Sequence, residues 1–210
     1  MPRKGFLTAS SFDSLMSGFS KGVNNFDGKT ASDIVMQLAA DWLGHDMEGY
    51  EDEATGARAW GNEYECLARD AYSEQMVTEV KQASFTIAND ASYVGGTMDG
   101  LVGDDGGIEI KCPYNSVNHL DRESQRKKYK YQLQGYMWIF DLNWIDFISY
   151  DPRFPENLQL IVERVVRNES TIDDLRTRCA ASFILAKSRA LDFLGDPARL
   201  SEILIQFYGN

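Results

Sequence analysis

Two carboxylates and a lysine stand on two apolar segments that an Asp/Gly-rich turn joins. Within residues 95–113, Asp99 precedes the turn, and Glu109 and Lys111 follow it two residues apart. Side chains two apart in a β-strand point to one face, so Glu109 and Lys111 should share a face, with Ile110 pointing the other way. A hairpin at the turn would bring Asp99 beside them. The sequence therefore predicts a compact site of two carboxylates and one ammonium group.

This set of groups suits phosphodiester hydrolysis assisted by a divalent metal. Mg²⁺ prefers oxygen ligands and usually binds through one or two carboxylates together with substrate phosphate. Asp99 and Glu109 would supply the carboxylates, and the carbonyl oxygen of Ile110 would be a third ligand. Lys111 would orient the attacking water and help stabilise charge on the phosphate. The alternative is a half-buried strand with a solvated charged face after an ordinary Asp-Gly turn.

The hairpin resembles the PD-(D/E)XK nuclease motif, and in detail that of the YqaJ-type viral recombinase and phage lambda exonuclease family. Four further segments resemble motifs of this family in the same order along the chain. They are Arg-Lys-Gly-Phe-Leu-Thr-Ala-Ser at 3–10, Trp-Gly-Asn-Glu-Tyr-Glu at 60–65, Gln-Leu-Gln at 132–134 with Met-Trp at 137–138, and Tyr-Asp-Pro-Arg at 150–153. Each motif is short, but their order is specific, and together they span most of the chain.

The resemblance implies a restriction-endonuclease-like fold, a three-layer α/β sandwich in which helices flank a central mixed β-sheet. It also implies a Mg²⁺-dependent 5′–3′ exonuclease, with Mn²⁺ as a substitute metal, that degrades one strand of linear double-stranded DNA to 5′-mononucleotides. The 3′ single strand would then pass to a single-strand annealing protein, as in phage recombination. Members of the family form rings, often trimers, that encircle DNA, so we expect a homo-oligomer of that kind.

Two further side chains would assist catalysis if the resemblance holds. Glu65 would add a carboxylate near the metal, directly or through water, and Glu63 is the fallback for that role. The alternative for Glu65 is an ion pair with Arg69, four residues further along a helix. Gln132 would hydrogen-bond the nucleophilic water or a phosphate oxygen. The alternative for Gln132 is a glutamine at the edge of the core that bonds to the backbone.

Arg3, Ser10 and Thr97 resemble the family's pocket for the 5′ phosphate that each cut leaves behind. An arginine offers phosphate a two-pronged contact, and hydroxyl groups add directed donors. Such a pocket would favour 5′-phosphorylated ends and let the enzyme advance along the strand. Thr97 stands where the family has a serine, which keeps the hydroxyl. The alternative for Arg3 is a disordered terminal residue.

The composition predicts one globular domain that spans residues 1–210, since 43% of its 210 residues are hydrophobic and 25% are charged. No apolar run reaches membrane-spanning length and no signal-type stretch follows the N-terminus, so we expect a cytoplasmic protein that does not bind a membrane. The three cysteines are far apart and odd in number, which argues against a disulfide framework, a zinc knuckle or an iron–sulfur cluster. We expect all three to be buried or partly buried thiols.

The net charge of −11 conflicts with DNA binding, because contacts to phosphate need Lys and Arg. The conflict disappears if the basic residues gather where DNA passes. The densest basic run lies at residues 122–130, and Arg3-Lys4 and Arg153 form smaller groups. The alternative for the run is a solvated helix face.

Hydrophobic periodicity places helices before and after a group of strands, an order typical of an α/β sandwich. The predicted helices lie at residues 32–43, 57–75, 129–140 and, with Ser170 and Asp173 as its cap, up to residue 194, and Ser10 with Asp13 and Pro197 open two shorter ones. The predicted strands lie at residues 84–88, 93–102, 107–113, 146–150 and 158–166.

Two other classes of function stay open. One is an endonuclease of the same superfamily that cuts at a site or a junction, which activity on closed circular DNA would favour. The other is a non-catalytic DNA-binding or partner-binding module on the same fold. The complete set of Asp99, Glu109 and Lys111 argues against the second class, because a binding module has no need to place two carboxylates against DNA.

Overall fold

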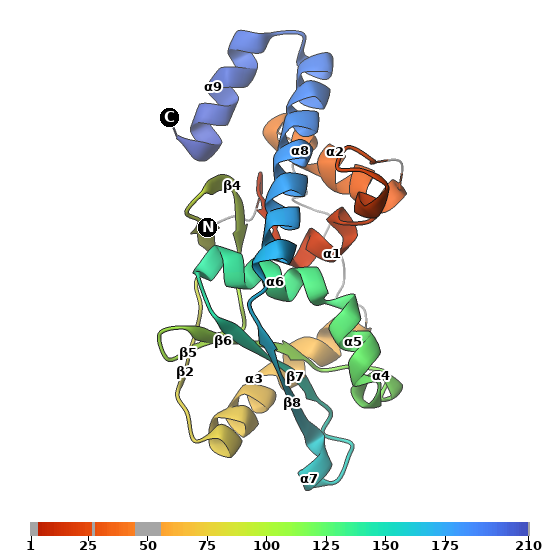
Figure 1. Cartoon of the computed structure of the whole chain (residues 1–210), viewed down its shortest axis with the longest axis vertical. Coiled ribbons are helices and arrows are strands. Elements are labelled where there is room, and N and C mark those ends of the chain that lie inside the picture. The colour runs from red at the N-terminus through yellow and green to blue at the C-terminus, as the bar shows by residue number, and fades with distance from the viewer. Residues whose placement is uncertain (1–3, 27, 45–55, 210) are drawn as a thin grey trace.

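The structure is a computed structural model, and it describes residues 4–26, 28–44 and 56–209 (Figure 1). The helices are α1 (Phe12–Leu15), α2 (Lys29–Trp42), α3 (Gly56–Met76), α4 (Val117–Leu120), α5 (Arg122–Lys128), α6 (Lys130–Phe140), α7 (Glu156–Gln159), α8 (Glu169–Leu194) and α9 (Pro197–Tyr208). The strands are β1 (Leu7–Thr8), β2 (Val80–Lys81), β3 (Thr86–Ala88), β4 (Ala91–Gly96), β5 (Gly100–Val102), β6 (Gly106–Lys111), β7 (Trp144–Tyr150) and β8 (Leu160–Val166).

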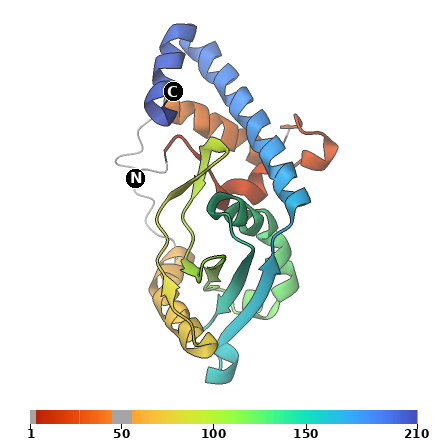
Figure 2. The same ribbon diagram turned by 60° about the vertical axis from the view of Figure 1, so that its left-hand side comes forward.

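The strands form two sheets. The larger has the order β2-β5-β6-β7-β8, in which β6 and β7 run parallel and the other neighbours run antiparallel. The smaller sheet has the order β1-β4-β3. Helix α3 lies below the larger sheet, while α6 crosses above it and α2, α8 and α9 extend the molecule at the far end (Figures 1 and 2). A mixed central sheet flanked by helices confirms the predicted α/β sandwich.

The alternation of side chains along β6 assigns each of its residues to one face of the larger sheet. Ile108 and Ile110 lie in a buried cluster with Ala68 and Tyr72 of α3. Glu109 points to the opposite face, where its carboxylate meets α6. Burying each isoleucine contributes roughly 1.5–3 kcal/mol, which fixes the register of the strand. The predicted division, with Ile110 on one face and Glu109 on the other, is confirmed.

The predicted strand 93–102 is wrong in one respect, because it is two strands in two sheets. β4 belongs to the smaller sheet and β5 to the larger, and residues 97–99 between them leave both ladders. In this break the carboxylate of Asp99 accepts a hydrogen bond of 2.7 Å from the backbone N–H of Ile110. A side chain that bonds to backbone competes with regular pairing, so it stabilises an irregular segment here.

The cap of the long helix α8 lies two residues before the predicted one. The side chain of Asn168, not of Ser170, accepts a hydrogen bond from the N–H of Thr171 at 2.8 Å and caps the helix. Asn and Ser are about equally good caps, so the sequence pattern alone did not separate them. No helix in the described ranges is long and apolar enough to cross a membrane.

Candidate active site

Most of the predicted catalytic residues lie close together around strand β6. Glu109 Oε1 accepts hydrogen bonds of 2.7 Å from Lys111 Nζ and from Gln132 Nε2. Asp99 reaches the same strand through its bond to the Ile110 N–H. Glu109 is only 3% exposed, so its charge is compensated mainly by these two donors. The alternative of a solvated strand face does not describe this site.

Helix α6 presents Gln132 from its first turn, and a distant carboxylate holds that turn in place. Asp13 accepts hydrogen bonds from the backbone N–H groups of Tyr131 at 3.0 Å and Gln132 at 2.9 Å. These are two of the N–H groups that a helix start leaves without a partner inside the helix. Sequence reasoning gave Asp13 only a local role at the first helix, because nothing in its neighbourhood points to α6.

The structure confirms the ion pair of Glu65, and its catalytic role stays a prediction. Its carboxylate pairs with Arg69 at 2.7 Å along α3, as the alternative held. The same side chain also lines a cavity together with Ile110 and Lys111. Arg69 Nε donates in addition to the backbone oxygen of Asp99 at 3.2 Å, so the pair ties α3 to the segment that carries Asp99. Glu63, the fallback, is exposed on the helix.

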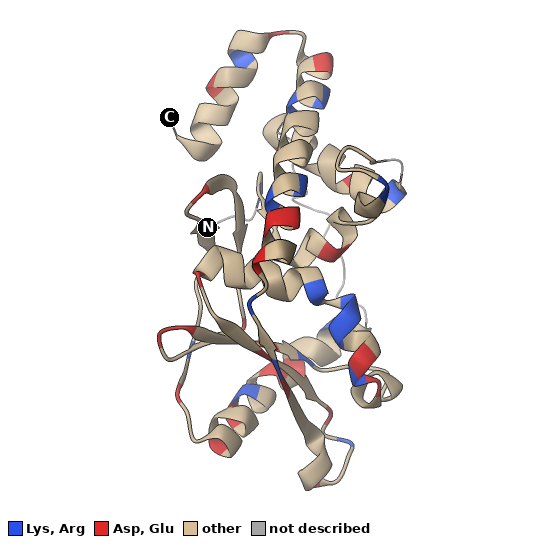
Figure 3. Cartoon of the chain, in the orientation of Figure 1, with Lys and Arg blue, Asp and Glu red and all other residues tan. Residues whose placement is uncertain are grey.

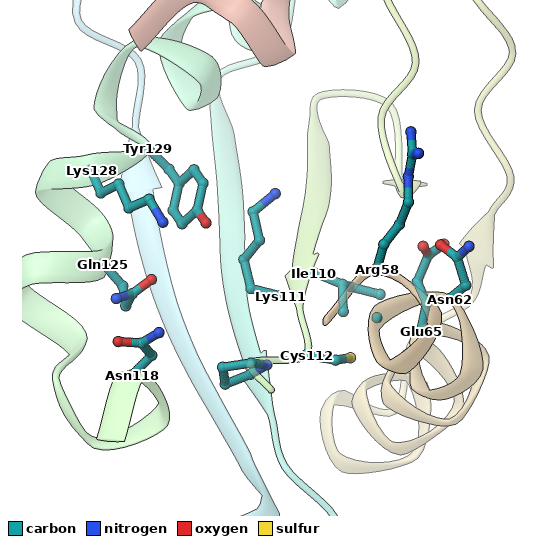
Figure 4. A pocket seen from close by; sticks show the side chains of 12 residues that line it. Arg58, Asn62, Glu65, Ile110, Lys111, Cys112, Asn118, Gln125, Lys128 and Tyr129 are labelled. Atoms are coloured by element: carbon teal, nitrogen blue, oxygen red, sulfur yellow. The ribbon is translucent and has the colours of Figure 1, made fainter. Parts of the chain in front are cut away.

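The cavity measures about 300 Å³ and lies between two walls, with Lys111 rising between them (Figure 4). Helix α3 forms one wall, and α4 and α5 form the other. The lining side chains labelled in the figure are Arg58, Asn62 and Glu65 on the first wall, Asn118, Gln125, Lys128 and Tyr129 on the second, and Ile110, Lys111 and Cys112 from the sheet. Lys111 Nζ lies 4.5 Å from the centre of the Tyr129 ring, a cation–π contact that helps to orient it.

The site raises the pKa values of two charged groups for different reasons. Burial raises the pKa of Asp99 to about 8, and the negative charge of Glu109 adds to it, while the bond from the Ile110 N–H opposes the shift. Burial by itself lowers the pKa of Lys111, but the charge and hydrogen bond of Glu109 outweigh burial and leave that pKa above its usual value. Lys111 is therefore a cation at neutral pH, and two carboxylates compete for compensation beside it.

The donor atoms here fit a divalent cation. No group of three or more His, Cys, Asp and Glu side chains within the described ranges is placed to hold a metal ion. Mg²⁺, however, commonly uses one or two carboxylates and takes its other oxygens from water and substrate phosphate. Glu109 Oε2 is buried and has no hydrogen-bond partner among the described residues. That unpartnered oxygen and the raised pKa of Asp99 both fit a site that binds a positive charge.

The predicted 5′-phosphate residues are only partly described. Arg3 lies outside the described residues. Thr8 pairs with Gly95 where β1 and β4 run parallel, and Ser10 and Thr97 each follow two residues later. Ser10 is exposed, with its Oγ 3.2 Å from Thr8 Oγ1, and Thr97 is half-buried. The pairing sets the two hydroxyl residues at the ends of adjacent strands, and their role as a pocket stays a prediction.

The segment that leads to Arg3 is held from both sides. Gly5 donates its N–H to Asp41 of α2 at 2.9 Å, and its carbonyl accepts a hydrogen bond from the Tyr208 hydroxyl of α9. Tyr208 in turn accepts from Trp42 Nε1 at 2.7 Å. Gly5 has φ of 82°, a conformation that favours glycine, and an added Cβ would lie 2.4 Å from the Phe207 ring.

The predicted basic groups have different roles, and Figure 3 shows Lys and Arg interspersed with Asp and Glu over several helices. Lys128 of α5 lines the cavity. Arg126 pairs with Glu163 at 2.9 Å and Lys127 with Glu123 at 2.7 Å, as expected of a solvated helix face. Arg153 binds Asp151 and two backbone carbonyls, so it positions the chain instead of facing DNA freely. DNA contact by the run at residues 122–130 stays a prediction.

The cysteines match their predicted burial at two of three positions. Cys179 is buried and Cys112 is half-buried at the cavity, where burial raises the pKa of its thiol to about 12. Cys66 is exposed on α3, so the prediction for it was wrong. All three are free thiols. The protonated Cys112 is a poor nucleophile, which leaves the chemistry to the oxygen and nitrogen groups.

Comparison with known proteins agrees with this geometry. The model of the YqaJ-like viral recombinase domain matches residues 2–143. The chain belongs to this family. Comparison with curated protein sequences yields no match.

Solved structures of exonucleases match nearly the whole chain. The alkaline exonuclease LHK-Exo of Laribacter hongkongensis is 26% identical with a TM-score of 0.79, over 94% of this chain and 96% of that one. LHK-Exo in complex with dAMP gives a TM-score of 0.80 at the same identity and coverage. A phage-related exonuclease from Haemophilus somnus 129PT shares the fold, with 19% identity, a TM-score of 0.71 and coverage of 90% and 96%.

Proposed function

We propose that this YqaJ-like protein is a metal-dependent deoxyribonuclease that degrades one strand of linear duplex DNA from its 5′ end. One observation carries the proposal: Glu109 is buried against Lys111 and Gln132, beside Asp99, and Lys111 lines the adjoining cavity. A structural ion pair would not need a second carboxylate that destabilises the first. Family membership and the likeness to solved exonucleases support a nuclease.

Asp99, Glu109 and the carbonyl of Ile110 would hold the metal, for which Mg²⁺ suits the all-oxygen donors and Mn²⁺ would substitute. A bound divalent cation would neutralise charge on the scissile phosphate and supply an activated water. Asp99 must lose its proton to serve as a ligand, so its raised pKa predicts that binding releases a proton.

The other residues act on the water and the phosphate. Lys111 stays protonated, so it would stabilise negative charge on the phosphate and donate a hydrogen bond to the attacking oxygen. Gln132 keeps Glu109 in position and can also bond the water. Glu65 lines the cavity and adds a carboxylate that would act through water. The hydrogen bonds of Lys111 and Gln132 to Glu109 form without DNA and would supply part of the preorganisation that catalysis needs.

The wider proposal follows the family. Arg3, Ser10 and Thr97 would bind the 5′ phosphate after each cut, and residues 1–210 would form one catalytic domain. A trimeric ring around the duplex would let the product leave while DNA stays bound. The 3′ strand would be passed to a single-strand annealing protein in the cytosol of the host cell.

The test compares linear duplex DNA labelled at the 5′ or 3′ end with a closed circle, in Mg²⁺ and in Mn²⁺. We expect early release of the 5′ label as mononucleotide, an intact circle, and loss of activity in Lys111→Ala. Lys127→Ala is the matched control, because that lysine is 72% exposed and is not among the residues that line the cavity.

Each other outcome overturns part of the proposal. Cutting of the circle would establish an endonuclease, and early release of 3′ label would reverse the polarity. DNA binding without turnover in either metal would leave a binding module. Equal activity of Lys111→Ala and Lys127→Ala would remove Lys111 from the mechanism.

A further inference from the structure

An aromatic cluster lies beside the cavity, and nothing in the proposed chemistry uses it. Trp60 packs against Tyr64 with ring centres 4.3 Å apart, and Tyr114 meets Trp60 edge-on at 6.1 Å. The guanidinium of Arg153 lies 4.5 Å from the centre of the Trp60 ring. The cluster joins α3 to the chain that follows β6, so it sits at the end of the strand that carries Lys111.

The cluster is held in place by Arg153. Its guanidinium binds the buried Asp151 through two nitrogens, each at 2.8 Å. It also donates to the carbonyls of Pro113 and Tyr114, both at 3.0 Å. Arg153 thus fixes the backbone under Tyr114 and covers one face of Trp60. A binding surface fixed in advance loses less conformational entropy when a ligand arrives.

Two features of the cluster are costly for the isolated chain. Tyr114 is 58% exposed although its ring is large and apolar. Trp60 Nε1 is buried and has no hydrogen-bond partner within the described residues. The exposed Tyr114 ring, supported from inside by Trp60, therefore offers a surface on which an aromatic ligand can stack.

The neighbouring groups identify that ligand by its charge. Pro113, next to Tyr114, lines the cavity with Lys111, and so does Arg58, two residues before Trp60. In Figure 4 Arg58 extends away from α3, and Lys128 lies on the other side of Lys111. Cations along the cavity suit a phosphate backbone, and an exposed ring at its edge suits a base. The aromatic rings therefore adjoin the cavity that the cations line, a combination that suits a single nucleic acid strand.

We propose that Tyr114, backed by Trp60, is a platform on which a nucleobase of the strand being cut stacks. This inference rests on the proposed nuclease function and adds to it a contact with the base. Stacking is tolerant of sequence, because every base has a π face. The platform would keep a frayed end from re-pairing and hold the next phosphate near Lys111.

The test combines removal of the ring with removal of the base. Binding of a 5′-phosphorylated duplex is measured in EDTA for wild type, Tyr114→Ala and Tyr114→Phe, with 2-aminopurine or an abasic residue at successive positions from the 5′ end. Phe193→Ala is the control, since that ring is 82% exposed on α8, in the helical end of the molecule (Figure 1). Light scattering follows the mass of each variant.

At one position we expect quenching of 2-aminopurine by wild type and Tyr114→Phe and none by Tyr114→Ala. Tyr114→Ala should bind roughly 5- to 150-fold more weakly, as expected for the loss of one stacked base. With an abasic residue at that position, Tyr114→Ala and wild type should bind equally. Phe193→Ala should behave as wild type.

Three results would overturn the platform. Tyr114→Ala could bind DNA as tightly as wild type, or it could lose the same affinity whichever position is abasic. A changed mass of Tyr114→Ala in light scattering would instead assign the ring to contact with a second copy. Failure of the nuclease proposal would look different, because wild type itself would then cut none of the DNA substrates. A chain that cuts DNA but shows no Tyr114-dependent quenching refutes the platform alone.

Discussion

Replacing Gly61 with alanine should make the protein more stable and less active at once. Gly61 lies inside α3 and lines the cavity that Lys111 enters. A Cβ added there would meet no other heavy atom within 4 Å. Packing inside the chain therefore does not require glycine at this position, and the open space next to it is the proposed path of the DNA strand.

The gain in stability follows from helix propensity. Glycine in a helix interior is about 0.5–1 kcal/mol less favourable than alanine, because it loses more backbone entropy on folding. In a chain of 150–250 residues each kcal/mol moves Tm by about 2–4 °C. We therefore expect the Tm of Gly61→Ala to rise by about 1–4 °C, measured by calorimetry.

The loss of activity follows from the volume of the new methyl group. An extra methyl in a closely packed contact typically costs about 1–3 kcal/mol. At 1.36 kcal/mol per tenfold, kcat/KM on linear duplex DNA should fall about 5- to 150-fold. Initial rates of release of labelled nucleotide measure this change, and most of it should appear in KM, because the methyl group obstructs the strand and leaves Lys111 untouched.

Gly135→Ala is the matched control for the stability half of the argument. Gly135 is also inside a helix, but its Cβ would lie 2.4 Å from the Phe12 ring, so overpacking should exceed the propensity gain and lower Tm. A Gly61→Ala variant that melts below wild type would refute the inference that the space next to Gly61 is open. A more stable variant with wild-type kcat/KM would show that the DNA strand does not approach α3 here.

Three further predictions follow from buried polar contacts. The pKa of Asp99 is raised from an ordinary 3.8 to about 8. Between these pH values the folded state holds a proton that the unfolded state has lost, so metal-free protein should lose stability as pH rises through this window. Asp99→Asn should flatten the dependence of Tm on pH; an unchanged slope would contradict the assignment. Tyr72→Phe removes a 2.8 Å hydrogen bond to the buried Asp146 and should cost about 1–3 kcal/mol in urea unfolding at unchanged kcat, whereas a loss below 0.5 kcal/mol would show that Asp146 is satisfied without it. Tyr208→Phe frees the Gly5 carbonyl and should raise KM for 5′-phosphorylated ends several-fold more than for 5′-hydroxyl ends; equal changes would refute a link between α9 and the phosphate pocket.

Local periodicity in the sequence was enough to predict those parts of the site that lie within a single helix or strand. The spacing of two between Glu109 and Lys111 decides that they share a face, because the period of a strand is fixed by its geometry. The bounds of helix α3 were predicted within one residue at each end, since a helix of 21 residues repeats its hydrophobic pattern over several turns. These features follow from neighbours in sequence.

The parts that escaped prediction depend on contacts between distant segments. Asp13 caps a helix that begins far along the chain, and no pattern around Asp13 records its partner. The break at residues 97–99 exists because Asp99 bonds to the backbone of β6, which a strand pattern over 93–102 cannot show. Strands of two residues, such as β1 and β2, are too short to produce any periodicity.

The acidic net charge is consistent with a nuclease once the position of each charge is considered. The protein places Lys111, Arg58 and Lys128 around one cavity, while many of its other cations are held in ion pairs with carboxylates. A surface that repels phosphate outside the cavity makes the free end of a strand the favoured point of entry. The same logic applies inside, where the negative charge of Glu109 raises the pKa of Asp99 and a bound cation would lower it again. The charges that this site places together for catalysis thus lower the stability of the fold, and a bound metal ion would offset that loss.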